Sequence, residues 1–320
     1  MEEHNKYQVL LYYNYAKLND AEEFAKKHLK FCKALGIKGR IIVAEEGLNG
    51  TVSGSSEQCE AYMAEVRSDE RLKNTEFKID WSDTHAFQKM HVRYKPEIVH
   101  LGLRGGNDVD PTVQTGKHLD PKDLEKMIAE NPNVVLVDMR SNYEHSVGRF
   151  KNAVTLDIEN FREVPENLDK LESLKGKTVV TYCTGGIKCE KASALLLREG
   201  FKDVYQLHGG IIKFGQETDG SLFDGKCYVF DNRLTVDINH VNPTIVSRCY
   251  ICSNPSDRMV NCANPECNEH VAICEDCGWE YEGACSTECQ EHPRKREYDG
   301  TGYYVKTGGE EPVHKQKSEA

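Results

Sequence analysis

Hydrophobic positions in the first part of the chain follow strand and helix periods in turn. Residues 7–13 form an apolar run of strand length, and apolar residues then recur every three or four positions from Phe24 until Gly36. A second helix is expected from about residue 55, and further strands over residues 40–44, 50–53, 77–81 and 90–94. The order strand–helix–strand–strand–helix–strand predicts a ferredoxin-like (acylphosphatase-like) α+β domain over residues 1–104.

Farther along the chain, three short and continuously apolar runs are separated by helical patterns, at residues 134–137, 178–182 and 203–207. Such runs are typical of parallel strands that are buried on both faces. They end in Asp138, Cys183 and His208, and parallel sheets bind ligands at the carboxyl ends of their strands. We therefore expect a parallel α/β domain over residues 119–225, with its site at these three positions.

Composition predicts the remaining boundaries. Gly, Asp and Pro are frequent in residues 105–118, which we interpret as a linker. Residues 226–298 form a predicted cysteine-rich segment, in which cysteine pairs with little apolar periodicity begin at Cys249. The Gly-, Glu- and Lys-rich residues 299–320 predict a disordered tail.

Charge and hydropathy exclude several classes of protein. The 320 residues include 41 Lys and Arg against 52 Asp and Glu, a net charge of −11, so the protein is not basic overall. No apolar run approaches the roughly 18 residues of a membrane span, and no apolar segment follows the first residues as in a secretory signal. We expect a soluble, cytoplasmic protein without a membrane partner. Its 13 cysteines, an odd number, then favour metal binding or chemistry over disulfides.

Cys183 lies where a strand passes through a glycine-bearing loop into a helix. Backbone N–H groups and the positive end of a helix stabilise a thiolate at such a position and lower its pKa. Gly185 and Gly186 allow the loop to curl, and Lys188 adds a positive charge at its far end. The arrangement predicts an anionic sulfur or a bound oxyanion, supported by the neighbouring residues Thr184, Gly185, Gly186, Ile187, Lys188 and Cys189.

This segment resembles the rhodanese family, whose six-residue active loop starts with a cysteine that carries a persulfide. Residues 183–188 match that loop, residues 138–153 resemble the family's first signature, and Gly209-Gly210 its second. The resemblance implies that Asp138 and Arg140 brace the loop from the neighbouring strand. Related phosphatases have an arginine six residues after the cysteine, and this chain has Cys189 there, which argues against phosphatase chemistry.

Two segments together, residues 39–54 and 182–193, resemble the oxygen-dependent tRNA uridine(34) hydroxylase (TrhO) family over about residues 5–290. Members combine a ferredoxin-like domain, a rhodanese domain and a cysteine-rich region. The resemblance implies an oxidoreductase that converts the wobble uridine of tRNA to 5-hydroxyuridine with molecular oxygen. It implies tRNA, at its anticodon region, as the partner.

The residues show no site for an oxygen-activating cofactor of a familiar kind. No Gly-x-Gly-x-x-Gly follows a strand and no histidine–carboxylate set forms an iron triad, so we expect no flavin, NAD or iron. Redox chemistry then depends on Cys183, which either adds to C6 of uridine as thiolate or persulfide or donates oxygen as a sulfenate. Cys189 is a resolving partner or simply packs under the loop. The electron donor is unidentified.

A basic strand is the candidate RNA-binding surface. The positive residues Lys89, His91, Arg93 and Lys95 alternate with apolar ones, which places them on one face of a strand. Lys38 and Arg40 join them if the sheet is shared. A solvated strand face without RNA is the alternative interpretation.

Four close cysteine pairs follow, at Cys249 and Cys252, Cys262 and Cys267, Cys274 and Cys277, and Cys285 and Cys289. Eight thiolates suffice for two structural zinc sites with four cysteine ligands each. Ligation is either interleaved, with the first and third pairs on one ion, or sequential, and His270 or His292 could replace a cysteine. Unmetallated thiols are the alternative.

Two other functions fit parts of the pattern. The rhodanese-like loop alone would suit a sulfurtransferase that passes persulfide sulfur to a small acceptor or a protein. A zinc-bearing binding module without catalysis would leave Cys183 without a role.

Overall fold

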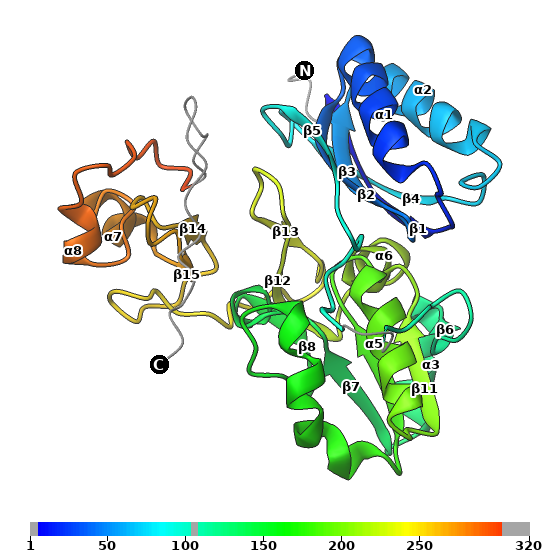
Figure 1. Cartoon of the computed structure of the whole chain (residues 1–320). Coiled ribbons are helices and arrows are strands. Elements are labelled where there is room, and N and C mark those ends of the chain that lie inside the picture. The colour runs from blue at the N-terminus through cyan, green and yellow to red at the C-terminus, as the bar shows by residue number, and fades with distance from the viewer. Residues whose placement is uncertain (1–5, 104–107, 303–320) are drawn as a thin grey trace. The chain divides into compact units, whose positions relative to one another are not determined.

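The computed structural model describes residues 6–103 and 108–302. The chain divides into two compact units, residues 1–243 and residues 244–320, and each is described by itself (Figure 1). The predicted disordered tail, residues 299–320, lies outside the described residues from residue 303 onward.

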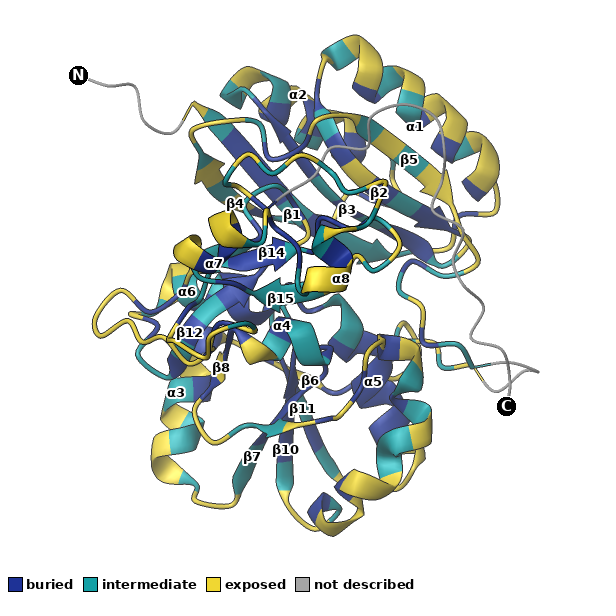
Figure 2. Cartoon of the chain, turned by 90° about the vertical axis from the view of Figure 1, so that its left-hand side faces the viewer, coloured by how far each residue is buried: buried dark blue, intermediate teal, exposed yellow. Residues whose placement is uncertain are grey.

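The first domain confirms the ferredoxin-like prediction, including the strand expected over residues 90–94. Its elements are β1 (Tyr7–Tyr15), α1 (Ala21–Leu35), β2 (Lys38–Ala44), β3 (Gly47–Gly54), α2 (Ser56–Ser68), β4 (Glu76–Ser82) and β5 (Met90–Tyr94). The strand order is β4-β1-β3-β2-β5, with β5 parallel to β2. Helices α1 and α2 cover one face of the sheet and expose their own outer surfaces (Figures 1 and 2).

Local sequence explains where these elements begin and end. Helix α1 ends at Gly36, which has φ 80° and adopts the left-handed conformation that favours glycine. Helix α2 begins after Ser55, whose side chain accepts from the Gln58 N–H while the Gln58 side chain accepts from the Ser55 N–H. At the start of β3, a Cβ on Gly47 would lie 2.0 Å from the Asn14 carbonyl oxygen, so only glycine fits there.

The strand registers determine which residues share the other face of this sheet. Lys78 on β4 pairs with Leu11 on β1, Leu11 with Thr51 on β3, Thr51 with Arg40 on β2, and Arg40 with His91 on β5. Directly paired residues point to the same face. These five residues, named here the cross-sheet row, therefore run across the face opposite the helices.

The second domain is the expected parallel α/β fold. Its elements are β6 (Lys117–Leu119), α3 (Pro121–Glu130), β7 (Val134–Asp138), α4 (Asn142–Ser146), β8 (Gly148–Phe150), β9 (Val154–Thr155), two 3-10 helices (Phe161–Glu163 and Pro165–Leu174), β10 (Thr178–Tyr182), α5 (Ile187–Arg198), β11 (Asp203–Leu207), α6 (Gly210–Glu217), β12 (Phe223–Tyr228) and β13 (Thr235–Asp237). The parallel sheet has the order β6-β11-β10-β7-β9, and β13-β12-β8 form a separate antiparallel sheet.

This domain extends beyond residues 119–225 at both ends. Lys117 and His118, placed in the predicted linker, belong to β6 and pair with β11. Cys227 and Ile238, placed in the predicted cysteine-rich segment, are buried in a core cluster with residues of β10, β11 and α6. Short edge strands carry too few residues to show a clear apolar period.

The second unit contains little regular structure. It comprises β14 (Met259–Asn261), β15 (His270–Ala272), α7 (Glu275–Glu280) and α8 (Thr287–Gln290). Cysteines make up much of its two small core clusters. Among the helices in residues 6–103 and 108–302, none has the length and apolar character to cross a membrane.

Candidate functional site

Cys183 follows β10 directly, at the carboxyl end of the strand as predicted. Its side chain is 1% exposed. Gly186, with φ 100°, turns the chain into α5, and its N–H donates to Cys183 Sγ at 3.2 Å. Behind the loop, Gly210 is required because a Cβ there would lie 2.5 Å from the Cys183 carbonyl oxygen. The loop is therefore built tightly around a buried sulfur.

The loop stabilises Cys183 as a thiolate. Burial alone would raise its pKa, but the Cys189 side chain, the Lys188 charge and the N–H groups of Lys188 and Gly186 together lower the pKa of Cys183 to about 6. Burial and the neighbouring Cys183 raise the pKa of Cys189 well above its ordinary value. These effects favour the thiolate at Cys183 and the neutral thiol at Cys189.

Lys188 pairs with a carboxylate that is itself buried. Its Nζ lies 2.5 Å from Glu144 Oε2, and Glu144 is 1% exposed. The ammonium also lies 5.8 Å from the centre of the Phe230 ring. Lys188 thus places its positive charge beside the loop, as expected, but that charge is shared with Glu144, which sequence reasoning did not select.

Among the described residues, no side chain of the loop forms a hydrogen bond or ion pair with Asp138 or Arg140. They form a fully buried ion pair, with Arg140 Nη2 at 2.7 Å from Asp138 Oδ2. The guanidinium also donates to the carbonyl oxygens of Glu144, at 3.2 Å, and Gly148, at 2.7 Å. The pair therefore holds the backbone that carries Glu144, and Glu144 holds Lys188. Of the other loop residues, the Thr184 hydroxyl donates to the Tyr228 carbonyl oxygen at 3.5 Å.

The N-terminal sheet covers this loop with the face that carries the cross-sheet row. A Cβ on Gly185 would lie 2.9 Å from Leu11 Cδ2, and one on Gly186 would lie 3.1 Å from the Tyr13 hydroxyl. Tyr13 donates to Glu190 Oε1 at 2.9 Å. The loop glycines therefore permit close approach of a second domain. The apolar run over residues 7–13 was the sequence signal for Leu11 and Tyr13, and it could not identify what they would cover.

A buried ion cluster joins the two domains beside the loop. Lys191 on α5 is fully buried, and its Nζ lies 2.8 Å from Glu46 Oε2 and 2.7 Å from Glu97 Oε2. Glu46 belongs to the N-terminal motif and Lys191 to the motif that contains Cys183. This contact gives a physical reason why the two motifs occur in one chain.

A cavity of about 520 Å³ lies where the two domains meet, and we call it the interdomain cavity. It is lined by Tyr13, Asn14, Tyr15, Asn74, Glu76, Lys78, Pro111, Thr112, Thr115, His118, Glu190, His208 and Gly209. His208, the third strand-end residue of the sequence analysis, therefore faces this cavity. A second, smaller cavity of about 40 Å³ includes Leu11, Lys78 and Thr184 in its lining.

The basic strand lies at the edge of the same sheet. Lys38 is half-buried, and the other candidates are exposed, namely Arg40, Lys89, His91, Arg93 and Lys95. The sheet is shared, because Arg40 pairs with His91 in the β2–β5 register. The structure thus brings the six residues together at one edge, and their contact with RNA stays a prediction.

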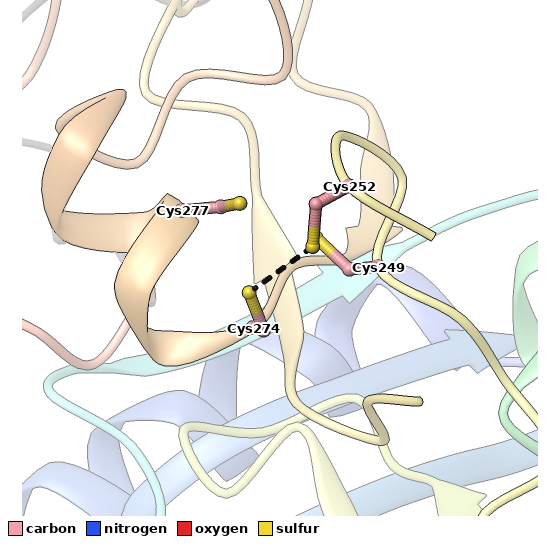
Figure 3. A group of neighbouring side chains, drawn as sticks. All are labelled: Cys249, Cys252, Cys274 and Cys277. Atoms are coloured by element: carbon pink, nitrogen blue, oxygen red, sulfur yellow. Dashed lines mark hydrogen bonds between the residues drawn. The ribbon is translucent and has the colours of Figure 1, made fainter. Parts of the chain in front are cut away.

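The eight C-terminal cysteines form two groups of four. Cys249, Cys252, Cys274 and Cys277 form one, and Cys262, Cys267, Cys285 and Cys289 the other, with the sulfur atoms of each within 4.8 Å of one another. The side chains of the first group converge from a loop and from the start of α7 (Figure 3). This arrangement is interleaved, and neither His270 nor His292 belongs to either of these groups.

The distances between the sulfur atoms of each group fit a metal ion that is coordinated tetrahedrally by four thiolates. Cys252 and Cys274 are 3.7 Å apart in the first group, and Cys267 and Cys285 are 3.7 Å apart in the second. Four thiolates at the Zn–S distance of about 2.3 Å are about 3.8 Å from one another. The residues present therefore fit one zinc ion in each group.

Comparison with known proteins agrees with this architecture. Family models match residues 7–98 (UPF0176 acylphosphatase like domain), 120–217 (Rhodanese-like domain) and 224–290 (Rhodanase C-terminal). A tRNA uridine(34) hydroxylase of Cytophaga hutchinsonii is 59% identical over 94% of this chain and 95% of its own. The chain belongs to the tRNA uridine(34) hydroxylase family.

The chain is also similar to other members of this family and to more distant solved structures. A tRNA uridine(34) hydroxylase of Bacillus licheniformis is 52% identical over 76% of each chain. A solved rhodanese-like domain protein of Staphylococcus aureus is 26% identical and covers 32% of this chain and 93% of its own, with a TM-score of 0.28. Family membership and the matching models confirm the predicted combination of an acylphosphatase-like and a rhodanese domain.

Proposed function

We propose that this protein hydroxylates the wobble uridine of tRNA at C5, with molecular oxygen as co-substrate. The observation that carries the proposal is a buried Cys183 thiolate at the junction of the rhodanese loop and the N-terminal sheet, in a chain 59% identical to a protein named for this activity. The substrate is the anticodon region of tRNA, which places the reaction in the cytoplasm.

Cys183 supplies the chemistry in this proposal. As thiolate or persulfide it adds to C6 of uracil, which raises the electron density at C5 for reaction with oxygen. One oxygen atom enters the base at C5, and a two-electron donor with two protons reduces the other to water. Loss of the C5 proton and cleavage of the S–C6 bond then restore the C5–C6 double bond and release Cys183. A sulfenate that donates oxygen is the competing mechanism. A covalent Cys183–tRNA adduct, trapped with a substrate analogue, would support addition, and its consistent absence would contradict it.

In this proposal, the basic strand binds the substrate, the Asp138–Arg140 pair positions the loop, and the cysteine groups stabilise the second unit. The basic strand binds phosphates of the RNA, and the Asp138–Arg140 pair positions the loop through Glu144 and Lys188. Each cysteine group holds one structural zinc ion, because closed four-thiolate sites leave no position for substrate. The short second unit has little other core to stabilise it.

To test the function, tRNA is isolated from cells with and without the protein, and its nucleosides are measured by mass spectrometry. Both kinds of cells are grown with and without oxygen. Loss of 5-hydroxyuridine without the protein, only in the aerated cultures, supports the proposal. Loss of a thiolated nucleoside instead would identify a sulfurtransferase. No change in any nucleoside would favour a binding module without catalysis.

A further inference from the structure

Lys78 is a buried cation that faces the interdomain cavity. It is 7% exposed and lines both this cavity and the smaller one beside Thr184. Among the described residues, none forms a hydrogen bond or ion pair with its ammonium group, which lies 5.2 Å from the centre of the Tyr13 ring. Burying an ammonium group without a hydrogen-bond or ion-pair partner is energetically unfavourable, so we expect a ligand to supply that partner.

The carboxylates around Lys78 already have other partners. Glu76, two residues before it on β4, lies 2.9 Å from His208. Asp80, two residues after it, lies 2.5 Å from Arg233. Glu190 accepts from the Tyr13 hydroxyl and lies 2.8 Å from His118. The Lys78 charge is therefore available to a group that enters the cavity.

The register places Lys78 next to the catalytic loop. It is the direct neighbour of Leu11 in the cross-sheet row, and Leu11 packs against Gly185. The same row continues through Arg40 to His91 in the basic strand. Four strand spacings of about 4.8 Å put Lys78 roughly 19 Å from that edge. Phosphates bound at the edge and a base bound at Lys78 could thus belong to one RNA strand.

We propose that the interdomain cavity receives the target uracil and that Lys78 is a catalytic residue that donates a hydrogen bond to its O4 carbonyl oxygen. The inference rests on the proposed function and adds a binding site and a residue to it. The cavity is in the size range of small-molecule sites, roughly 300–1,000 Å³, and several polar side chains converge on it.

The charge of Lys78 suits the addition step. When the Cys183 thiolate forms a bond to C6, the C5–C6 π bond breaks and its electron pair moves through C4 onto O4. The negative charge of the sulfur is then carried by an enolate oxygen, and the Lys78 ammonium stabilises it. Burial lowers the pKa of Lys78 to about 8, so the side chain remains mainly protonated at neutral pH.

The test uses Lys78→Met, which keeps the length of the side chain and removes its charge. In cells whose tRNA lacks 5-hydroxyuridine, the full chain and its variants are expressed at equal levels and the nucleoside is measured. We expect Lys78→Met to lower the product at least tenfold and Lys78→Arg to retain more of it. Lys30→Met, on the exposed surface of α1, is the matched control and should behave like the unchanged protein.

Two measurements on purified proteins separate catalysis from structure and from phosphate binding. Lys78→Met should melt no lower than the unchanged protein, because it removes an unpaired buried charge, and its Kd for tRNA should stay within about twofold. Product near the unchanged level, or no advantage of Lys78→Arg, would overturn the proposal. A tenfold weaker Kd would assign Lys78 to a phosphate instead. If the unchanged protein forms no 5-hydroxyuridine, the proposed function itself fails.

Discussion

At the scale of single residues, the proposed chemistry depends on the sulfur atom of Cys183, whose pKa is raised by some of its surroundings and lowered by others. Burial favours the neutral thiol of Cys183, whereas the Cys189 thiol, the Lys188 charge and two backbone N–H groups favour the thiolate, and the latter prevail. Cys189 remains protonated because a second buried negative charge beside the first is unfavourable.

Replacing Cys183 by serine should abolish hydroxylation and leave the fold intact. A serine hydroxyl is nearly isosteric with the thiol but stays protonated at neutral pH, so it cannot add to the base. The measurements are 5-hydroxyuridine in tRNA and the melting temperature. Product formation by the purified serine variant would show that the chemistry resides elsewhere.

The thiolate should form with a midpoint near pH 6, since the pKa of Cys183 is lowered to about 6. Thiolate absorbs near 240 nm, and subtracting the pH titration of Cys183→Ser removes the signal of the other cysteines. Absorbance should rise as pH increases through about 6. Lys188→Met should move the midpoint to higher pH, because it removes a positive charge that favours the thiolate. A midpoint near that of a free cysteine in both proteins would contradict this account of the loop.

At the scale of elements, we propose two functions for the face of the N-terminal sheet that the helices leave uncovered. Strands β1 and β4 place Leu11, Tyr13 and Lys78 over the catalytic loop and its cavity. Strands β2 and β5 carry the basic residues on the same face. Helices cover only one side of this ferredoxin-like sheet, so the other face can contact the second domain or RNA. A mainly antiparallel sheet does not require a covering layer on both faces.

Replacing Lys89, Arg93 and Lys95 together by alanine should weaken tRNA binding and reduce its dependence on salt. Each lost phosphate contact lowers the slope of log affinity against log salt by about one. Binding measured across a salt series tests this. The control replaces Lys26, Lys27 and Lys30, on helix α1, by alanine, which changes the charge equally on the opposite side of the sheet. If both triple variants bind tRNA alike, the binding surface lies elsewhere.

At the scale of the whole molecule, two kinds of long-range contact hold the chain together. In the first unit, Lys191 connects Glu46 and Glu97 to helix α5, so the N-terminal domain is fixed over the loop by fully or partly buried charges. In the second unit, each cysteine group joins two segments separated by about twenty residues. In the proposed function, a metal ion bound by each cysteine group would stabilise this short unit.

The protein should contain about two zinc ions per chain when purified without chelator. Cys252→Ser should lower the content to about one, and so should Cys267→Ser, because each residue belongs to a different group. Elemental analysis of the three proteins measures this. Absence of zinc from all of them would contradict the proposal, and loss of both ions in either variant would show that the two groups do not bind independently.

The sequence by itself determined the elements and the local chemistry, because both depend on neighbouring residues. Short apolar runs and helical spacing predicted the two folded domains, and the passage from strand through glycines to helix identified the Cys183 loop. The spacing of the cysteine pairs predicted metal-binding groups. Each of these signals is contained within about a dozen residues, where periodicity and capping operate.

Only the tertiary structure decided which distant residues meet. Glu144 contacts Lys188 across 44 positions, and Tyr13 contacts Glu190 across 177. Lys78 is the single lysine of strand β4, and only the register shows that it lies beside Leu11, which packs over Gly185. The interleaved cysteine groups likewise follow from how the chain folds back. Such contacts arise from packing and burial between elements, which the periodicity of a single segment does not encode.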